Sequence, residues 1–218
     1  MQFHPDEEQV LREGGVIIGV DEVGRGSLAG PICAAACVIT SAERAMFSQR
    51  NTRTVKIGDS KMLSKLQREK TYSWLKDTVR IVFIRIEAQQ IDLHGIQKAN
   101  THAIEEALRQ AISSHPNANA VAFIDHFKIT LPKGFSRSIS STRGDNTYVS
   151  VACASIWAKV SRDAVMKDLA AAHPEYGWDS NVGYGTKAHI QGIQTYGATS
   201  YHRKSFLTKM QSSCSKEA

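Results

Sequence analysis

The stretch VIIGVDEVGRGSLAGP, residues 16–31, carries the features on which a fold assignment depends. Its first five residues are apolar and mostly β-branched, which predicts a short buried strand. This run ends on two acids, Asp21 and Glu22, and then enters a glycine-rich turn, Gly24-Arg25-Gly26. A second apolar run, residues 32–39, returns tightly after the turn and predicts a neighbouring strand. Two acids at the end of a buried strand are the first candidates for chemistry.

Strands and helices are both expected in the remaining sequence. Further strands are predicted at residues 80–86, at 121–124 and, as an edge strand, at 135–142. Helices are predicted within 41–57, from Ser64, over 96–111 and over 147–171, and Ser64 with Gln67 fits a capping box. The last forty or so residues read as loops with short helices. This order predicts a mixed α/β domain with a small helical C-terminal extension.

Composition narrows the class of protein. The 218 residues suffice for one sizeable core, and 27 Lys and Arg against 21 Asp and Glu give a net charge of +6. That excess favours polyanionic partners, although a basic protein without such a partner fits charge alone equally well. Four cysteines lack zinc-binding spacing, and no apolar run is long enough to span a bilayer. We therefore expect a cytoplasmic protein with reduced thiols and no membrane association.

Two more acids extend the candidate site. Asp125 ends a short apolar strand, as Asp21 does, and Asp145 precedes a predicted helix. Strand ends are where an α/β sheet presents ligands, and Mg²⁺ prefers carboxylate oxygens. Taken singly, each acid is more simply explained as part of a solvated turn or as a helix cap. Asp21 and Glu22 would also point to opposite faces of an ideal strand, so a shared site requires the strand to end or bulge there.

The chain resembles the type 2 ribonuclease H family (ribonuclease HII) in a series of ordered motifs. Residues 19–31 match its GVDEVGRGSLAGP-like signature, and Asp59-Ser60-Lys61 matches its DSK segment. The matches continue in order with FID at 123–125, RGD at 143–145, ASIWAKVSRD at 154–163, GYGTKAH at 183–189 and HRKSF at 202–206.

The resemblance implies a five-stranded mixed sheet of the ribonuclease H type, flanked by helices. It implies a catalytic domain at 14–173, a loop and helical extension at 174–211 and a disordered tail at 212–218. The metal ligands and catalytic residues would be four carboxylates, Asp21, Glu22, Asp125 and Asp145. They would hold Mg²⁺ or Mn²⁺, with two ions bound when substrate is present.

The resemblance also implies a substrate. Family members cut the RNA strand of RNA–DNA hybrids and nick duplex DNA on the 5′ side of an embedded ribonucleotide, leaving 3′-hydroxyl and 5′-phosphate ends. Gly24, Arg25 and Gly26 would sense the ribose 2′-hydroxyl, and Tyr184 would pack against the sugar. A 2′-hydroxyl is the chemical handle that separates ribose from deoxyribose, and a glycine-flanked backbone can approach it closely. A monomer is expected.

Several basic residues are candidates for phosphate contacts, which position a duplex without reading its sequence. They are Arg25, Lys61, Lys159, Arg162 and Lys187. A solvated basic face explains any single one of them equally well. Tyr184 stands between two glycines with no evident packing neighbour in the sequence, which favours a ligand contact.

Two residues differ from the family pattern, and three other classes of protein are alternatives to it. Ser27 stands where the family commonly has proline, and His126 where it has glycine, but neither change removes a metal ligand. A type 3 ribonuclease H would carry an additional N-terminal domain, whereas 20 residues precede Asp21. A junction-resolving nuclease would not need Tyr184 or the Arg25 turn. A non-catalytic nucleic-acid-binding protein would be indicated by a missing carboxylate, and all four are present.

Overall fold

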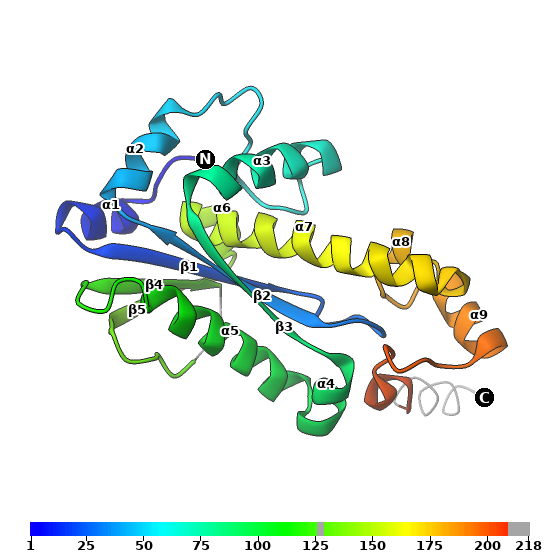
Figure 1. Cartoon of the computed structure of the whole chain (residues 1–218). Helices are drawn as coiled ribbons and strands as arrows, with labels where there is room; N and C mark the ends of the chain where they lie inside the picture. Colours follow the sequence, from blue (N-terminus) through cyan, green and yellow to red (C-terminus); the bar gives the residue numbers. More distant parts are fainter. Residues whose placement is uncertain (126–128, 209–218) are drawn as a thin grey trace. The chain divides into compact units, whose positions relative to one another are not determined.

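The computed structural model describes residues 1–125 and 129–208, and its centre is one five-stranded sheet of order β3-β2-β1-β4-β5 (Figure 1). The mixed α/β fold and its flanking helices agree with the prediction. The strands are β1 (Val16–Val23), β2 (Ile32–Ile39), β3 (Arg80–Ile86), β4 (Ala120–Asp125) and β5 (Phe135–Ser141).

Parallel pairing brings two of the acidic strand ends to one edge of the sheet. β1 runs parallel to β4 with Val16 opposite Ala120 and Val20 opposite Ile124. Asp21 and Asp125 follow these last partners, so both lie at carboxyl ends of neighbouring parallel strands. β5 pairs parallel to β4 and occupies the predicted edge.

The helices follow the prediction in most places. The long helix α7 (Val149–Ala172) begins two residues later than expected, and α3 (Lys65–Thr78) starts at Ser64 through the predicted capping box with Gln67. The remaining helices are α1 (Pro5–Arg12), α2 (Ser41–Gln49), α4 (Ala88–His94), α5 (Ile96–Ile112), α6 (Gly144–Thr147), the 3₁₀ turn η1 (Pro174–Tyr176), α8 (Trp178–Asn181) and α9 (Lys187–Tyr196).

Three helices were absent from the sequence prediction: α1, α4 and the four-residue α6, which contains Asp145 although this acid was expected to precede a helix. α1 has Pro5 at its first position and three acids in its first turn, which are typical of a helix start. Because the segment is rich in charged residues, its sequence indicated a polar, irregular stretch instead. α4 is a short helix placed directly after β3. A seven-residue element is too short for periodicity to identify.

The chain divides into two compact units, each described by itself. The first unit comprises residues 1–23, 34–84 and 101–160, and the second comprises 24–33, 85–100 and 161–218. Both units are built from segments far apart in the sequence. The predicted domain limits at 173 and 211 stay a prediction, and the tail at 212–218 lies outside the described residues.

Apolar side chains fill both units. In the first unit, Ile17, Phe123 and Val151 are buried together with residues from α1, α2, α3 and the sheet. In the second unit, Met166 and Trp178 form the centre of a smaller aromatic-rich core. Burial on this scale supplies most of the favourable free energy of folding.

The described cysteines are reduced, and the helices can be compared with what a membrane-spanning segment requires. Cys33, Cys37 and Cys153 are buried free thiols, as expected, and Cys214 lies outside the described residues. Within residues 1–125 and 129–208, none of the helices combines the length and apolar character that a bilayer-crossing segment needs.

A buried acid anchors the N-terminus of α7. The Glu7 carboxylate accepts hydrogen bonds from the Val149 and Ser150 backbone N–H groups at 3.1 and 2.9 Å, and from the Ser150 hydroxyl at 2.7 Å. Helix N-termini leave backbone donors unsatisfied, and a carboxylate there also complements the helix dipole. Glu7 thereby joins α1 to the helix that follows the RGD motif.

Replacing Glu7 with glutamine should lower the free energy of unfolding by about 1–3 kcal/mol, because one acceptor oxygen becomes a donor facing buried N–H groups. Urea unfolding followed by circular dichroism measures this change. The control Glu13→Gln alters an exposed acid and should shift stability by less than about 0.5 kcal/mol. Equal effects of the two substitutions would contradict the capping role of Glu7.

Candidate active site

The four predicted carboxylates all lie in the first unit. Asp21 and Glu22 are on β1, Asp125 is the last residue of β4, and Asp145 is in the first turn of α6. A shared site was expected to require the strand to end or bulge at the two acids, whereas β1 continues through both of them to Val23. Pairing with β4 extends only to Val20, so the two acids lie beyond that ladder.

Asp21 occupies an electrostatically unfavourable position. Burial and the negative charge of Glu22 raise the pKa of Asp21 to about 8, and the charge of Asp145 acts in the same direction. A hydrogen bond from the Ser155 side chain partly opposes the rise in this pKa. The Ser155 hydroxyl also lies 2.9 Å from that of Ser60, which connects the DSK segment to Asp21 through two serines.

Asp125 and Asp145 are brought together by a short connection. The Gly144 N–H donates to Oδ1 of Asp125 at 2.9 Å. A Cβ at Gly144 would lie 3.3 Å from the Asp125 Cα, so only glycine fits easily between the two acids. Burial, Asp59 and Asp125 raise the pKa of Asp145, whereas the charge of Lys61 lowers it.

The backbone before Asp145 is strained. Arg143 has φ of 64° and ψ of 51°, a left-handed conformation that non-glycine residues seldom adopt. Such conformations persist where surrounding contacts impose them, and they concentrate at functional sites. Here the strained residue turns the chain from β5 into α6, which carries Asp145.

The chemistry of these donors fits a hard divalent cation. All four are carboxylates, and burial, together with the negative charge of neighbouring acids, raises the pKa of Asp21 and Asp145. In the part of the chain that the structure describes, no three His, Cys, Asp or Glu side chains converge closely enough to hold an ion as they stand. The four carboxylates therefore match a divalent cation in ligand type and in charge.

The Gly24-Arg25-Gly26 turn belongs to the second unit and is held from its carbonyl side. The buried Arg203 guanidinium donates to the carbonyl oxygens of Gly24, Arg25 and Gly30 at 2.7–3.0 Å. Carbonyl and N–H point in opposite directions across a planar trans peptide. The peptides that follow Gly24 and Arg25 therefore present their N–H sides away from Arg203.

Arg162 corrects one prediction. It was a candidate for a phosphate contact, but it is fully buried and bonds within the protein. Its guanidinium donates to the carbonyl oxygens of Pro31, Val182 and Ala29 and to the Ser27 hydroxyl at 2.9–3.3 Å. Ser27, the departure from proline, is thus an acceptor for this arginine. The other departure, His126, lies outside the described residues.

Tyr184 is 39% exposed and has packing neighbours, in contrast to what the sequence indicated. The Arg162 guanidinium carbon lies 5.9 Å from its ring centroid, and a Cβ on Gly26 would lie 3.9 Å from the ring. The second unit therefore brings Tyr184 beside the Gly24-Arg25-Gly26 turn. Gly183 and Gly185 on either side of Tyr184 make this approach possible.

The predicted basic contacts differ in exposure. Arg25, Lys61 and Lys187 are exposed, and Lys159 is half-buried on α7. Sequence analysis missed Arg203, Ser60 and Ser155 as positioning groups, although all three lie inside matched motifs. Their hydrogen-bond partners are distant in sequence, so no local pattern could have identified them.

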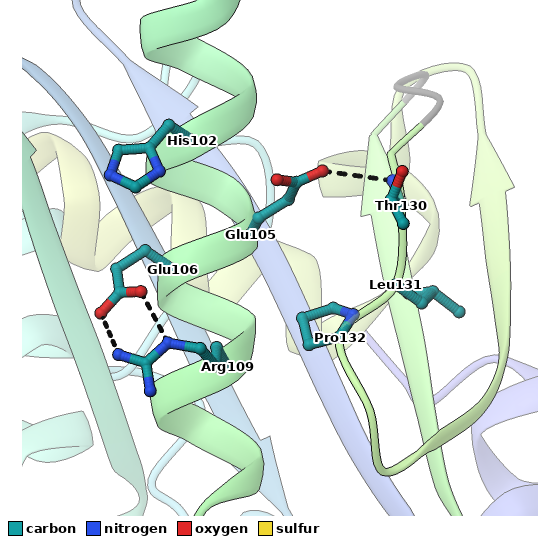
Figure 2. Close-up of a pocket in the computed structure, with 7 residues that line it drawn as sticks. All are labelled: His102, Glu105, Glu106, Arg109, Thr130, Leu131 and Pro132. Carbon is teal, nitrogen blue, oxygen red and sulfur yellow. Dashed lines mark hydrogen bonds and ion pairs between the residues drawn. The ribbon is translucent and has the colours of Figure 1, made fainter.

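A hollow in the first unit lies between α5 and the segment before β5 (Figure 2). Its charged groups are satisfied locally: Glu106 pairs with Arg109 at 2.5 Å, and Glu105 accepts from the Thr130 N–H at 3.3 Å (Figure 2). Groups already paired contribute little to binding a ligand. None of the predicted site residues lines this hollow.

Comparisons with known proteins agree with this picture. Residues 18–209 match the model of the family described as Ribonuclease HII. The ribonuclease HII of Paramagnetospirillum magneticum is 37% identical over 203 residues, which cover 93% of this chain and 95% of that protein. The crystal structure of ribonuclease H2 from Pyrococcus horikoshii OT3 has a TM-score of 0.70 at 24% identity, covering 87% of this chain and 93% of that one.

A further solved structure, Bst-RNase HIII in complex with Mn²⁺, has a TM-score of 0.66 at 20% identity. The match covers 88% of this chain and 67% of that chain. At this identity the likeness concerns the fold.

Substituting alanine for Gly24 should destabilise the protein by about 2 kcal/mol. Gly24 has φ of +87°, and an added Cβ would lie 2.2 Å from Nε of Arg162, whose hydrogen bonds prevent it from moving aside. The control Gly58→Ala places its methyl group in open space, so its free energy of unfolding should stay within about 0.5 kcal/mol of the wild type. Urea titration distinguishes the two variants, and wild-type stability of Gly24→Ala would contradict the close approach.

Proposed function

Because the chain belongs to the ribonuclease HII family, and is therefore a metal-dependent endoribonuclease of the ribonuclease H type, we propose that it nicks duplex DNA on the 5′ side of a single embedded ribonucleotide as well as cutting RNA–DNA hybrids. The products are a 3′-hydroxyl and a 5′-phosphate. The observation that carries this proposal is the packing of Tyr184 beside the Gly24-Arg25-Gly26 turn.

The metal ligands in this proposal are Asp21, Glu22, Asp125 and Asp145. Burial raises the pKa of Asp21 and of Asp145, so a divalent cation, Mg²⁺ or Mn²⁺, would stabilise the charged forms of these carboxylates. These carboxylates would hold two such ions, which would supply activation of a water molecule and stabilisation of the departing 3′-oxygen. The Ser155 hydroxyl orients Asp21, and the Gly144 N–H orients Asp125. Nucleophilic catalysis by a protein side chain is not part of the proposal.

Recognition of ribose belongs to the second unit. The N–H side of the turn peptides faces away from Arg203 and offers donors to a 2′-oxygen, while the Tyr184 ring packs against the sugar. A deoxyribose cannot accept those hydrogen bonds and leaves the donors unmatched. Arg203 holds the turn rigid from behind, so little order has to be gained on binding. In the sequence, one residue separates Gly24 from Glu22.

Phosphate contacts supply affinity without sequence preference. Arg25, Lys61, Lys159 and Lys187 are assigned to the backbone of the duplex, since exposed or half-exposed cations release counterions when they neutralise phosphates. The enzyme acts as a cytoplasmic monomer, with the catalytic residues in a domain at 14–173 and Tyr184 in the extension at 174–211.

The first test uses duplex DNA that contains one ribonucleotide, with an all-DNA duplex and an RNA–DNA hybrid for comparison. With Mg²⁺ or Mn²⁺ the wild type should nick on the 5′ side of the ribonucleotide, and a chelator should abolish cleavage. Asp21→Asn should lower kcat by about 10³-fold or more, since a carboxylate ligand is lost. Product ends are identified on a denaturing gel by ligation and by phosphatase treatment.

The matched control for this test is Asp77→Asn, an exposed acid on α3, which should keep wild-type activity. Circular dichroism confirms that both variants are folded. Full activity of Asp21→Asn would remove the metal-site assignment. Cleavage of long hybrids alone would remove the single-ribonucleotide assignment.

The second test addresses Tyr184. Tyr184→Ala should lower kcat/KM on the single-ribonucleotide duplex by about tenfold, or ~1.4 kcal/mol, and should affect a long hybrid less. Tyr196→Ala removes a tyrosine that is 66% exposed on α9 and should leave both substrates unchanged. Equal losses on the two substrates would show that Tyr184 has no special role at the RNA–DNA junction.

A further inference from the structure

A buried run of hydrogen bonds ends on the backbone of Tyr184. Nδ1 of His189 lies 2.9 Å from the Tyr184 carbonyl oxygen, and Nε2 of His189 lies 3.2 Å from Nε2 of His202. Nδ1 of His202 accepts from the Thr199 N–H at 2.9 Å, and the Trp178 indole N–H donates to Nε2 of His189 at 2.9 Å. We call Thr199, His202, His189 and Trp178 the histidine chain; all four belong to the second unit.

The partners of the two rings determine where their protons are. An indole N–H can only donate, so Nε2 of His189 is an acceptor and its proton is on Nδ1, which donates to Tyr184. A backbone N–H can likewise only donate, so Nδ1 of His202 is an acceptor and its proton is on Nε2, directed at His189. Each ring is therefore neutral, in one defined tautomer. The two rings carry opposite tautomers.

The surroundings favour these neutral forms. Both rings are buried, and burial lowers the pKa of His189 and lowers that of His202 to about 4. Other titratable groups near them include Tyr176, whose ring centroid lies 4.8 Å from that of His202, and His173, which pairs with Glu175 at 3.4 Å. The fully buried Arg203 is next in sequence to His202. The nearby positive charges oppose a further proton on either histidine.

Tyr184 needs such a support because its neighbours are glycines. Gly183 has φ of +85°, and glycine on either side leaves the backbone many accessible conformations. The Tyr184 N–H donates to the Asn181 carbonyl at 2.9 Å, and its carbonyl also accepts from the Thr186 N–H at 2.8 Å. The bond from His189 connects this peptide to a side chain that is fully buried.

We propose that His189, held in its Nδ1–H tautomer by Trp178 and His202, is a positioning residue that sets the Tyr184 ring against the Gly24-Arg25-Gly26 turn and thereby determines preference for a single ribonucleotide. The inference rests on the proposed role of Tyr184 in substrate recognition. His189 acts through Tyr184 and does not contact the substrate. His202 and Thr199 act one step further back, by fixing the tautomer of His189.

The tautomers can be observed without substrate. In ¹⁵N-labelled whole protein at pH 7, long-range ¹H–¹⁵N spectra should show His189 protonated on Nδ1 and His202 protonated on Nε2. Free histidine in water favours the Nε2–H form, so the opposite state of His189 is diagnostic. A His189 ring protonated on Nε2, or on both nitrogens, would overturn the proposal.

Two substitutions at His189 separate positioning from packing. The asparagine amide nitrogen occupies about the place of the histidine Nδ1, so His189→Asn keeps the donor to Tyr184. The glutamine amide reaches the place of Nε2, so His189→Gln keeps the link toward Trp178 and His202 and loses that donor. The matched control is His94→Gln, an exposed histidine on α4.

We expect His189→Gln to raise KM for the single-ribonucleotide duplex about tenfold, the effect of one lost hydrogen bond, with a smaller change on a long RNA–DNA hybrid. His189→Asn should retain most of the wild-type preference, and His94→Gln all of it. Thermal unfolding shows whether the variants are equally folded. Equal behaviour of His189→Gln and His189→Asn on the two substrates would overturn the proposal, since packing alone would then account for His189.

The variant Tyr184→Ala distinguishes the positioning role of His189 from the proposed recognition of ribose by Tyr184. If Tyr184→Ala lowers the preference for a single ribonucleotide and His189→Gln does not, the role of Tyr184 stands and the histidine chain is dispensable. If Tyr184→Ala leaves the preference unchanged, the proposed recognition by Tyr184 itself is wrong. A parallel loss of preference in Tyr184→Ala and His189→Gln, retained in His189→Asn, supports both.

Discussion

Like charges held together at the edge of an apolar sheet are the constraint around which the first unit is built. β1 and β4 are buried up to Val20 and Ile124, and the acids begin immediately afterwards. Burial and Glu22 raise the pKa of Asp21 to about 8, so its charged form carries an electrostatic cost. Hydrogen bonds from the protein offset only part of that cost. Cations satisfy such a group better than any neutral donor does, which is the physical basis for assigning a divalent ion to it.

A glycine on β1 lets helix α7 approach this edge of the sheet. A Cβ on Gly19 would lie 2.3 Å from the Ser150 carbonyl carbon, so α7 can begin against β1 only because that position is glycine. The same helix carries Ser155 toward Asp21, and Glu7 caps its first turn. Catalytic geometry on a rigid helix and strand is held more exactly than on loops. The stability of α7 and the orientation of Asp21 are consequently linked.

In the second unit, side chains hold in place a loop that has little secondary structure of its own. Arg203 and Arg162 do this by donating to carbonyl oxygens of the loop after β1. A guanidinium offers five donors in a fixed plane, so one side chain can hold several peptides at once. Burial beside Arg162 lowers the pKa of Arg203 to about 9, a measure of the cost of that arrangement. The ordered loop is the part of the molecule assigned to ribose.

The sequence by itself determined the strands, the long helices and the identities of the acids. Apolar β-branched runs and capping residues are local, so β1 and the start of α3 at Ser64 could be predicted from neighbouring residues alone. Only the tertiary structure decided that Arg162 serves the interior and that His189 carries its proton on Nδ1. These outcomes depend on partners between 5 and 135 positions away in the chain. Burial, which follows from packing, fixes what a charged or polar group must bond to.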